Sequence, residues 1–281
     1  MRSLGKAMLT AVLVLALGGL AACTKHAEPA GPSGPPGQPG PQTTITIAGS
    51  TSVQPVSERL SEAFMAKNRG VRINVQGGGS SAGIKAARSG VADIGSSSRD
   101  LTSEERGLNE IPIAGDGIAI IVNPGSPLEN LTLEQIKSIF AGDVTDWKGL
   151  GQPASPITVV VREDGSGTRA AFEELVMKGT KCTANSAIQN STGAVRATVA
   201  TNPNAIGYVS LAGLDSTVKA VRVEGVEPTA ANILNGTYRV NRPFLYLTRE
   251  APTGLVKEYI DFVLSPEGQD IVAGENLVRV R

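Results

Sequence analysis

Short runs of β-branched and apolar residues alternate with segments of helical periodicity from Thr43 to the end of the chain. Val56, Leu60 and Phe64 recur every four residues, as on one face of a helix. Strands are predicted over 44–48, 71–76, 92–95, 157–161, 205–209, 220–223 and 244–247, and further helices over 82–89, 169–178, 253–264 and 266–273. This strand–helix alternation predicts an α/β fold with largely parallel sheets.

The only long apolar run stands at the start of the chain. Arg2 and Lys6 precede the apolar stretch 7–20, which is too short to span a bilayer comfortably. Small residues then lead directly into Cys23, as in a bacterial lipobox. We therefore expect a lipoprotein signal over 1–22 and a lipid on Cys23, which predicts an exported protein anchored to a bacterial membrane, facing the periplasm or the cell exterior. The alternative is an ordinary signal peptide with a chance cysteine.

A Gly- and Pro-rich tether is predicted over 23–42. Residues 31–42 form four Gly-X-Y triplets, GPS-GPP-GQP-GPQ. Four triplets are very few for a collagen triple helix, so a semi-rigid spacer is the favoured interpretation. His26, the only histidine of the chain, falls in this tether and outside any predicted folded site.

Charge and composition exclude several classes of protein. The 26 basic residues balance the 26 acidic ones, whereas a nucleic-acid-binding protein normally has a basic surplus. A mean hydropathy of zero argues against a multi-span membrane protein. Since the lipid occupies Cys23, Cys182 is left alone and is expected to be a partly buried, unreactive thiol.

Three segments share the pattern of a predicted strand, a Gly/Ser/Thr run and a predicted helix. The three runs are Gly49-Ser50-Thr51-Ser52, Gly77-Gly78-Gly79-Ser80-Ser81 and Asp164-Gly165-Ser166-Gly167-Thr168. The first N–H groups of a helix have no internal partner and lie at the positive end of its dipole, so a helix start stabilises an anion. Any one of these runs is compatible with an ordinary N-cap. Three gathered at the carboxyl edge of a sheet predict a site for a small tetrahedral anion.

A buried dianion needs a full positive charge close to it. Arg162 ends the strand predicted over 157–161 and directly precedes the third run. Its planar guanidinium suits phosphate oxygens, and Asp164 is predicted to orient it. The alternative for Arg162 is a surface ion pair. For Trp147, simple packing is the favoured interpretation.

The segment from Arg162 to Thr168 resembles the R-x-D-G-S-G-T motif of the phosphate-binding proteins of bacterial phosphate ABC importers. Other segments match that PstS-like family in the family's order: Gly49-Ser50-Thr51-Ser52-Val53, Gly79-Ser80-Ser81-Ala82-Gly83, Asp93-Ile94-Gly95-Ser96-Ser97-Ser98, and the stretch from Asn130 to Trp147. The likeness extends over nearly all of 43–281.

The resemblance implies a class II periplasmic binding-protein fold, with two α/β lobes joined by two crossing hinge strands. Lobe I would comprise 43–117 plus 212–281, and lobe II 118–211, with crossings near 118–123 and 206–211. By position, the residues expected to contact phosphate are Thr51, Ser52, Ser80, Ser98, Arg162, Ser166, Gly167 and Thr168. Asp164 would steady the arginine. The implied partners are inorganic phosphate and the membrane permease subunits of an ABC importer, for a monomer without cofactor or metal.

Ser98 departs from the family pattern, which has an aspartate at this position to accept a hydrogen bond from the proton of phosphate. Sulfate carries no such proton at neutral pH, so the acceptor helps to reject it. A serine hydroxyl donates as well as accepts, and it excludes sulfate less firmly. We expect Asp116 to be the carboxylate that substitutes for it.

Three alternative functions stay open at this stage. A phosphoester hydrolase on the same scaffold would share the recognition of phosphate, but the sequence after the tether has no histidine to act as a base or metal ligand. A carrier of another oxyanion, such as sulfate, would use the same donors. A collagen-like adhesin is supported only by the four triplets.

Overall fold

The structure is a computed structural model that describes residues 43–280. The predicted signal segment 1–22, the lipidation site Cys23 and the tether 23–42 lie outside the described residues. The described residues fall within one unit of the chain. Their buried apolar side chains nevertheless gather into separate clusters. Of the helices between Thr43 and Val280, none has the length and apolar character needed to cross a membrane.

The first core lies between a group of strands and three helices, and we define it as the cluster around Ile45, Ile47, Phe64, Phe244 and Tyr259. Alternate residues of the first strand are buried in it, as expected for a strand with one face against a core. The elements of this part are β1 (Thr43–Gly49), α1 (Gln54–Lys67), β2 (Val71–Gly77), α2 (Ser80–Ser89), β3 (Ile94–Ser97), β10 (Asn241–Thr248), α7 (Gly254–Val263) and α8 (Pro266–Gly274). Helix α2 packs on the other face of the sheet, over the small cluster that contains Ile84 and Leu247.

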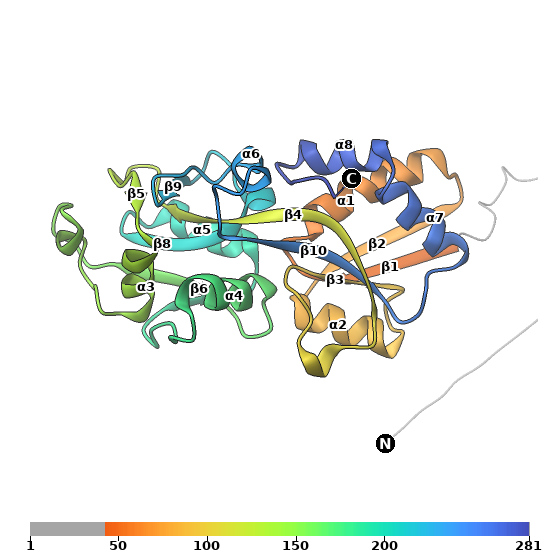
Figure 1. Ribbon diagram of the computed structural model, residues 1–281, viewed down its shortest axis with the longest axis horizontal. Helices are drawn as coiled ribbons and strands as arrows, with labels where there is room; N and C mark the ends of the chain where they lie inside the picture. Colours follow the sequence, from red (N-terminus) through yellow and green to blue (C-terminus); the bar gives the residue numbers. More distant parts are fainter. Residues whose placement is uncertain (1–42, 281) are drawn as a thin grey trace, which may run out of the picture. The chain divides into compact units, whose positions relative to one another are not determined.

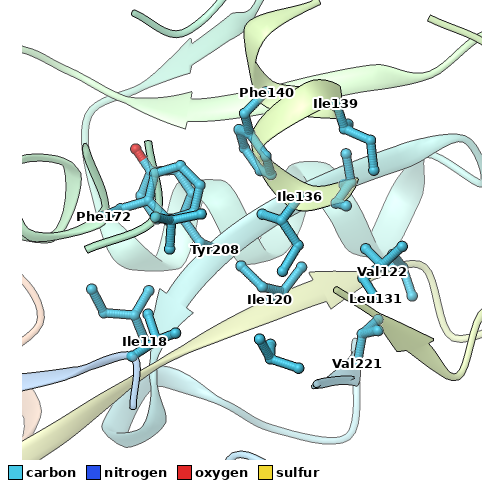
Figure 2. Packing of buried hydrophobic residues seen from close by; sticks show 14 of the residues in the cluster. Ile118, Ile120, Val122, Leu131, Ile136, Ile139, Phe140, Phe172, Tyr208 and Val221 are labelled. Carbon is cyan, nitrogen blue, oxygen red and sulfur yellow. The ribbon is translucent and has the colours of Figure 1, made fainter. Parts of the chain in front are cut away.

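The second core is the cluster around Ile118, Phe140, Phe172 and Tyr208 (Figure 2). The rings of Phe172 and Tyr208 stack with their centroids 4.2 Å apart. The elements of this part are β5 (Asn130–Leu131), α3 (Leu133–Ala141), β6 (Thr158–Arg162), α4 (Gly167–Phe172), β7 (Ala187–Gln189), α5 (Thr192–Thr201), β8 (Ala205–Ser210), β9 (Lys219–Val223) and α6 (Ala230–Leu234). A π-helical turn, Glu173–Met177, follows α4, and short 3-10 turns cover Ser103–Glu105, Trp147–Leu150 and Leu211–Gly213.

The strands are ordered β2-β1-β3-β10-β4-β8-β6-β7 (Figure 1). Pairing is parallel at both ends of this order, where β1 pairs with β2 and β3, and β6 pairs with β7 and β8. It is antiparallel in the middle, where β10 pairs with β3 and β4, and β4 pairs with β8 and β9. The expectation of largely parallel sheets therefore holds for the outer strands, and the fold is a mixed α/β fold.

Strand β4 (Asn109–Val122) belongs to both cores. Its residue Ile113 is buried in the first core and Ile118 in the second. The chain returns from the second core to the first between Val240 and Phe244. Val240 is buried in the second core and Phe244 in the first. β4 and β10 are thus adjacent where the chain passes between the cores (Figure 1).

This packing differs from the predicted lobe boundaries at one place. Residues 212–240 were assigned to lobe I, but Val221 and Tyr238 are buried in the second core. The hydroxyl of Tyr238 also donates a hydrogen bond of 2.8 Å to the carbonyl oxygen of Ile118. β8, where the second crossing was expected, packs its residues Ile206 and Tyr208 entirely in the second core. The return strand near 240–244 therefore occupies the place that was predicted for 206–211.

Most strands and helices predicted from periodicity are present, with bounds shifted by up to three residues, and the helix predicted over 169–178 is α4 followed by the π-helical turn. β3 begins two residues later than predicted. Several elements of the second core were not predicted, among them the short strand β7 and the helix α5 that follows it. Both contribute to the site described next.

Candidate functional site

Four Ser/Thr-rich segments meet where parallel strands end. β1 and β3 run parallel in one part of the fold and β6 and β7 in the other, so each pair ends at a common edge. The segments that follow these strands begin at Ser50, Ser98, Glu163 and Asn190. The segments that begin at Ser50, Glu163 and Asn190 lead into α1, α4 and α5, respectively. Helix α2 begins beside them at Ser80.

A cluster of buried hydroxyls joins the two parts of the fold. The side-chain oxygens of Ser52 and Thr168 lie 2.8 Å apart, although the residues are separated by 116 positions. On the side of the first core, the Ser50 hydroxyl donates to the Ser98 hydroxyl over 2.9 Å. The Ser98 backbone N–H donates to the Ser80 hydroxyl over 3.0 Å. All five side chains are at most 3% exposed. We call this set, together with Thr192, the hydroxyl cluster.

Thr192 is a member of the cluster that the sequence analysis missed. Its hydroxyl lies 2.9 Å from that of Ser52, and its backbone N–H donates to the Thr51 hydroxyl over 3.3 Å. Ser191 caps α5 by accepting a hydrogen bond from the backbone N–H of Ala194. The signal was present in the sequence, because Ser191-Thr192-Gly193 repeats the pattern of a strand, a Ser/Thr/Gly run and a helix. The strand before it has only three residues, which is too few to show a strand periodicity in the sequence.

Arg162 lies at the end of β6 and is 2% exposed. Its Nη1 donates to the Thr192 hydroxyl over 3.3 Å, so the guanidinium borders the hydroxyl cluster. Its Nε and Nη2 donate to the two carboxylate oxygens of Glu163, each over 2.7 Å. This paired contact fixes the plane of the guanidinium.

The prediction that Asp164 orients Arg162 is wrong. The Asp164 side chain is 97% exposed and pairs with Arg169 at 2.9 Å. Glu163 makes the paired contact instead, with Nε and Nη2 of Arg162. Strand β6 ends at Arg162, so the alternation of side chains along a strand does not extend to residues 163 and 164, and the sequence does not tell which of the two neighbouring carboxylates faces the arginine.

Ser166 and Gly167 bring α4 against the opposite part of the fold. The Ser166 hydroxyl caps α4 by accepting from the backbone N–H of Arg169 over 3.2 Å. Gly167 lies so close to the hydroxyl cluster that a Cβ atom there would be 2.2 Å from the Ser80 Oγ and 2.7 Å from the Ser98 Oγ. A side chain at position 167 is therefore incompatible with the observed approach of the two parts.

The backbone makes a further contact between the same two loops. The Ser81 N–H donates to the Gly165 carbonyl oxygen over 3.1 Å. Gly79 has a positive φ of 87°, which suits glycine, and this conformation leads into α2. The two glycine-rich runs found in the sequence thus lie against each other.

Asp116 does not substitute for an aspartate at position 98, although this was predicted. Its buried carboxylate accepts hydrogen bonds from the Ser210 hydroxyl, the Leu211 N–H and the Arg242 guanidinium. None of these partners belongs to the hydroxyl cluster. Its lone pairs are thus used, and the expectation that Asp116 substitutes for an aspartate at position 98 is wrong.

Two other expectations concern residues outside the cluster. Burial raises the pKa of the Cys182 thiol to about 11, which keeps it protonated and unreactive at neutral pH. Trp147 is buried in the second core and donates from Nε1 to the Asn204 carbonyl oxygen over 3.2 Å, so the prediction of a packing role is confirmed. Between Thr43 and Val280, no three His, Cys, Asp or Glu side chains are grouped as metal ligands.

The α/β fold and the position of the site at the ends of parallel strands define a ligand-binding protein. A family model described as a PBP superfamily domain matches residues 34–267. The chain is 34% identical to the phosphate-binding protein PstS of Bacillus subtilis, over 84% of this chain and 81% of the relative. The chain therefore belongs to the PstS family of the PBP superfamily.

Solved structures agree with this assignment. A Clostridium perfringens protein, described as a phosphate ABC transporter substrate-binding protein and solved with bound phosphate, is 51% identical, with a TM-score of 0.83 over 85% of this chain and 100% of that one. An ABC-type phosphate transport receptor from Vibrio cholerae is 37% identical, with a TM-score of 0.70 over 83% of this chain and 99% of that one. The predicted α/β fold of a phosphate-binding protein is confirmed.

Proposed function

We propose that this chain captures inorganic phosphate at the hydroxyl cluster and delivers it to an ABC importer. One observation carries the proposal: buried hydroxyls from both parts of the fold are in contact with one another, and the buried guanidinium of Arg162 borders them through Thr192. The Clostridium perfringens relative, solved with bound phosphate, supports the identity of the ligand. The relatives are named as binding proteins and transport receptors, so the proposed function is capture and not catalysis.

The donors suit a tetrahedral dianion. Hydroxyls and helix-start N–H groups supply short hydrogen bonds from several directions, and Arg162 supplies a full positive charge. We propose that Ser52, Ser80, Thr168 and Thr192 contact the anion directly, and that Glu163 holds Arg162 in place. Thr51, Ser98, Ser166 and Gly167 complete the proposed site.

Capture requires the two parts of the fold to separate and close. We propose a lobe I of 43–117 plus 241–281 and a lobe II of 118–240, following the two cores. β4 and the segment that enters β10 would be the crossing strands. The ligand favours closure because it bonds groups of both lobes at once, which only the closed arrangement allows.

We also propose that the protein is exported and held at a membrane by lipid on Cys23, and that it acts as a monomer. The apolar stretch and the small residues before Cys23 support the export and the lipid anchor. Labelled fatty acid should be incorporated into the wild-type chain and not into Cys23→Ser. Equal labelling of the two chains would contradict the anchor.

Uptake of labelled phosphate tests the proposed delivery. Cells that lack this chain should take up phosphate slowly at limiting concentration, and the wild-type chain should restore uptake while Arg162→Ala should not. Sulfate uptake in the same cells is the control. Restoration by Arg162→Ala, or no dependence on the chain, would rule out the proposed function.

Thr192→Val is expected to weaken phosphate binding by about tenfold, because it removes a buried hydroxyl that borders Arg162 and leaves the shape of the side chain nearly unchanged. Titration calorimetry on the chain from Thr24 onwards measures the effect. Thr201→Val, at the exposed end of the same helix, is the matched control and should bind as the wild type does. Equal affinities for the Thr192 variant and the wild type would remove Thr192 from the site.

Ser98→Asp is expected to raise the preference for phosphate over sulfate. Ser98 is fully buried and bonds Ser50 and Ser80, so a carboxylate there would face the hydroxyl cluster. Such a carboxylate accepts a hydrogen bond from the O–H group of phosphate and repels the unprotonated sulfate. The ratio of the two dissociation constants is the measurement, and a ratio that does not rise would contradict this role of position 98.

A further inference from the structure

A second buried arginine lies at the passage between the two cores. Arg242 of β10 faces Asp116 of β4 in direct register. Nε and Nη2 of Arg242 both donate to one carboxylate oxygen of Asp116, over 3.1 and 3.0 Å. The two side chains are 2% and 0% exposed, so the pair is removed from water.

This pair is connected to the hydroxyl cluster from two sides. Asp116 accepts from Ser210 and from the backbone N–H of Leu211, where the 3-10 turn Leu211–Gly213 begins. That turn packs on Thr192, since a Cβ atom on Gly213 would lie 2.5 Å from Thr192 Cγ2. On the other side, β10 pairs with β3, which ends directly before Ser98.

The guanidinium of Arg242 is incompletely satisfied. Within residues 43–280, its buried Nη1 has no hydrogen-bond partner. Such a donor is costly in the interior, and more so when it carries charge. Asp116 holds the opposite edge of the guanidinium, so Nη1 is on the edge that faces away from this carboxylate.

The charges of Arg242 and Arg162 act on each other. Burial lowers the pKa of Arg242, Asp116 opposes that shift, and the positive charge of Arg162 lowers the pKa further. Both guanidinium groups are buried, and like charges repel more strongly where the dielectric constant is low. A dianion beside Arg162 relieves this repulsion, because it attracts both.

We propose that Arg242 is the second positive charge of the phosphate site and acts on the anion through its field, while Asp116 limits that field. This inference rests on the proposed function. Arg162 is in contact with the cluster, and Arg242 is a positioning residue that favours the dianion over the monoanion. The Asp116–Arg242 pair thereby sets how strongly the site prefers a doubly charged ligand.

The test compares two variants of the same ion pair. Arg242→Gln should weaken phosphate binding by about tenfold at about pH 8, where phosphate is a dianion, and by less at about pH 5.5, where it is a monoanion. Asp116→Asn should tighten binding several-fold at the higher pH, because it removes the carboxylate and keeps the arginine. The double variant should return towards the wild-type affinity.

A purely structural role predicts a different outcome. Each single variant breaks the same buried pair, so both would then weaken binding, and equally at the two pH values. That result, or an Asp116→Asn affinity equal to that of the wild type, would overturn the inference. Arg222→Gln and Glu227→Gln, which break the exposed pair of these residues, are the matched controls and should leave binding unchanged.

Two further measurements keep the outcome interpretable. Thermal unfolding shows whether each variant is folded, and if Arg242→Gln is not, the sign of the change in Asp116→Asn alone decides. The wild-type titration separates the two claims. If the wild type fails to bind phosphate, the proposed function fails. If the wild type binds phosphate but Arg242→Gln and Asp116→Asn do not change the affinity in opposite directions, only the inference about Arg242 is refuted.

Discussion

Arg162→Ala is expected to weaken phosphate binding by about a thousandfold, which is the largest effect of any single substitution at this site. The guanidinium is 2% exposed and borders the hydroxyl cluster through Thr192. Without it, the dianion would lie in a region from which water is excluded and would lose its contacting counter-charge. A buried charge that loses its partner costs several kcal/mol, about 3–5 in measured cases.

Part of the loss of phosphate affinity in Arg162→Ala has a second cause, which a further substitution separates from the loss of the positive charge. Glu163 makes two hydrogen bonds to Arg162, and in the alanine variant its carboxylate would stay next to the anion and repel it. Arg162→Ala combined with Glu163→Gln should therefore bind more tightly than Arg162→Ala alone, though still far below the wild type. Glu163→Gln by itself should weaken binding modestly, because the guanidinium loses its paired contact.

Calorimetric titration with phosphate measures these affinities, and thermal unfolding verifies that the variants are folded. Arg222→Ala is the matched control, because Arg222 also pairs with a glutamate but is exposed in the second part of the fold. An affinity of Arg162→Ala within about tenfold of the wild type would contradict the role given to this residue.

Gly167→Val is expected to produce the second largest effect, a loss of affinity of at least about a hundredfold. A Cβ atom at position 167 would lie 2.2 Å from the Ser80 Oγ, 2.7 Å from the Ser98 Oγ and 3.0 Å from the Ser80 Cβ. These contacts cross from one part of the fold to the other, so the added side chain holds the proposed lobes apart. The ligand then loses the donors of one lobe.

Two measurements distinguish this explanation from simple misfolding. The variant should melt near the wild-type temperature, because an open arrangement tolerates the side chain, and small-angle scattering should show no compaction on addition of phosphate. Gly274→Val, where a Cβ atom meets nothing within 4 Å, is the control. A Gly167→Val protein that binds phosphate as tightly as the wild type would exclude the closure described here.

Local pattern predicted the parts of the site that depend on neighbours in sequence. A strand, a Gly/Ser/Thr run and a helix start are all encoded within about ten residues, and so Ser52, Ser80, Arg162 and Thr168 were identified before their proximity was known. Their convergence followed from the rule that parallel strands end at a common edge. The hydroxyls of Ser52 and Thr168 are indeed in contact.

The missed features depend on contacts between distant residues or on side-chain direction. Thr192 was overlooked because β7 has three residues, one of which, Ile188, is 62% exposed, so no buried periodicity marks the strand. Glu163 and Asp164 differ only in the direction that each side chain takes at a strand end. The Asp116–Arg242 pair joins residues 126 positions apart.

The lobe boundary shows the same limit. β9 and the segment that contains Tyr238 have ordinary strand and loop character, and nothing in their local sequence tells which core they join. The contact of Tyr238 with Ile118 decides it, across 120 positions. Antiparallel pairing of β10 with β4 then carries the chain back to the first core.

Calorimetry on the chain from Thr24 onwards, stripped of bound anion and titrated with phosphate and then with sulfate, is the direct test of phosphate capture at the hydroxyl cluster. We expect saturable one-to-one binding of phosphate that is lost in Arg162→Ala, with weaker binding of sulfate. Equal binding of the two anions would keep the capture site and make the protein a general oxyanion carrier. A wild-type protein that binds no phosphate would contradict the proposed capture of phosphate.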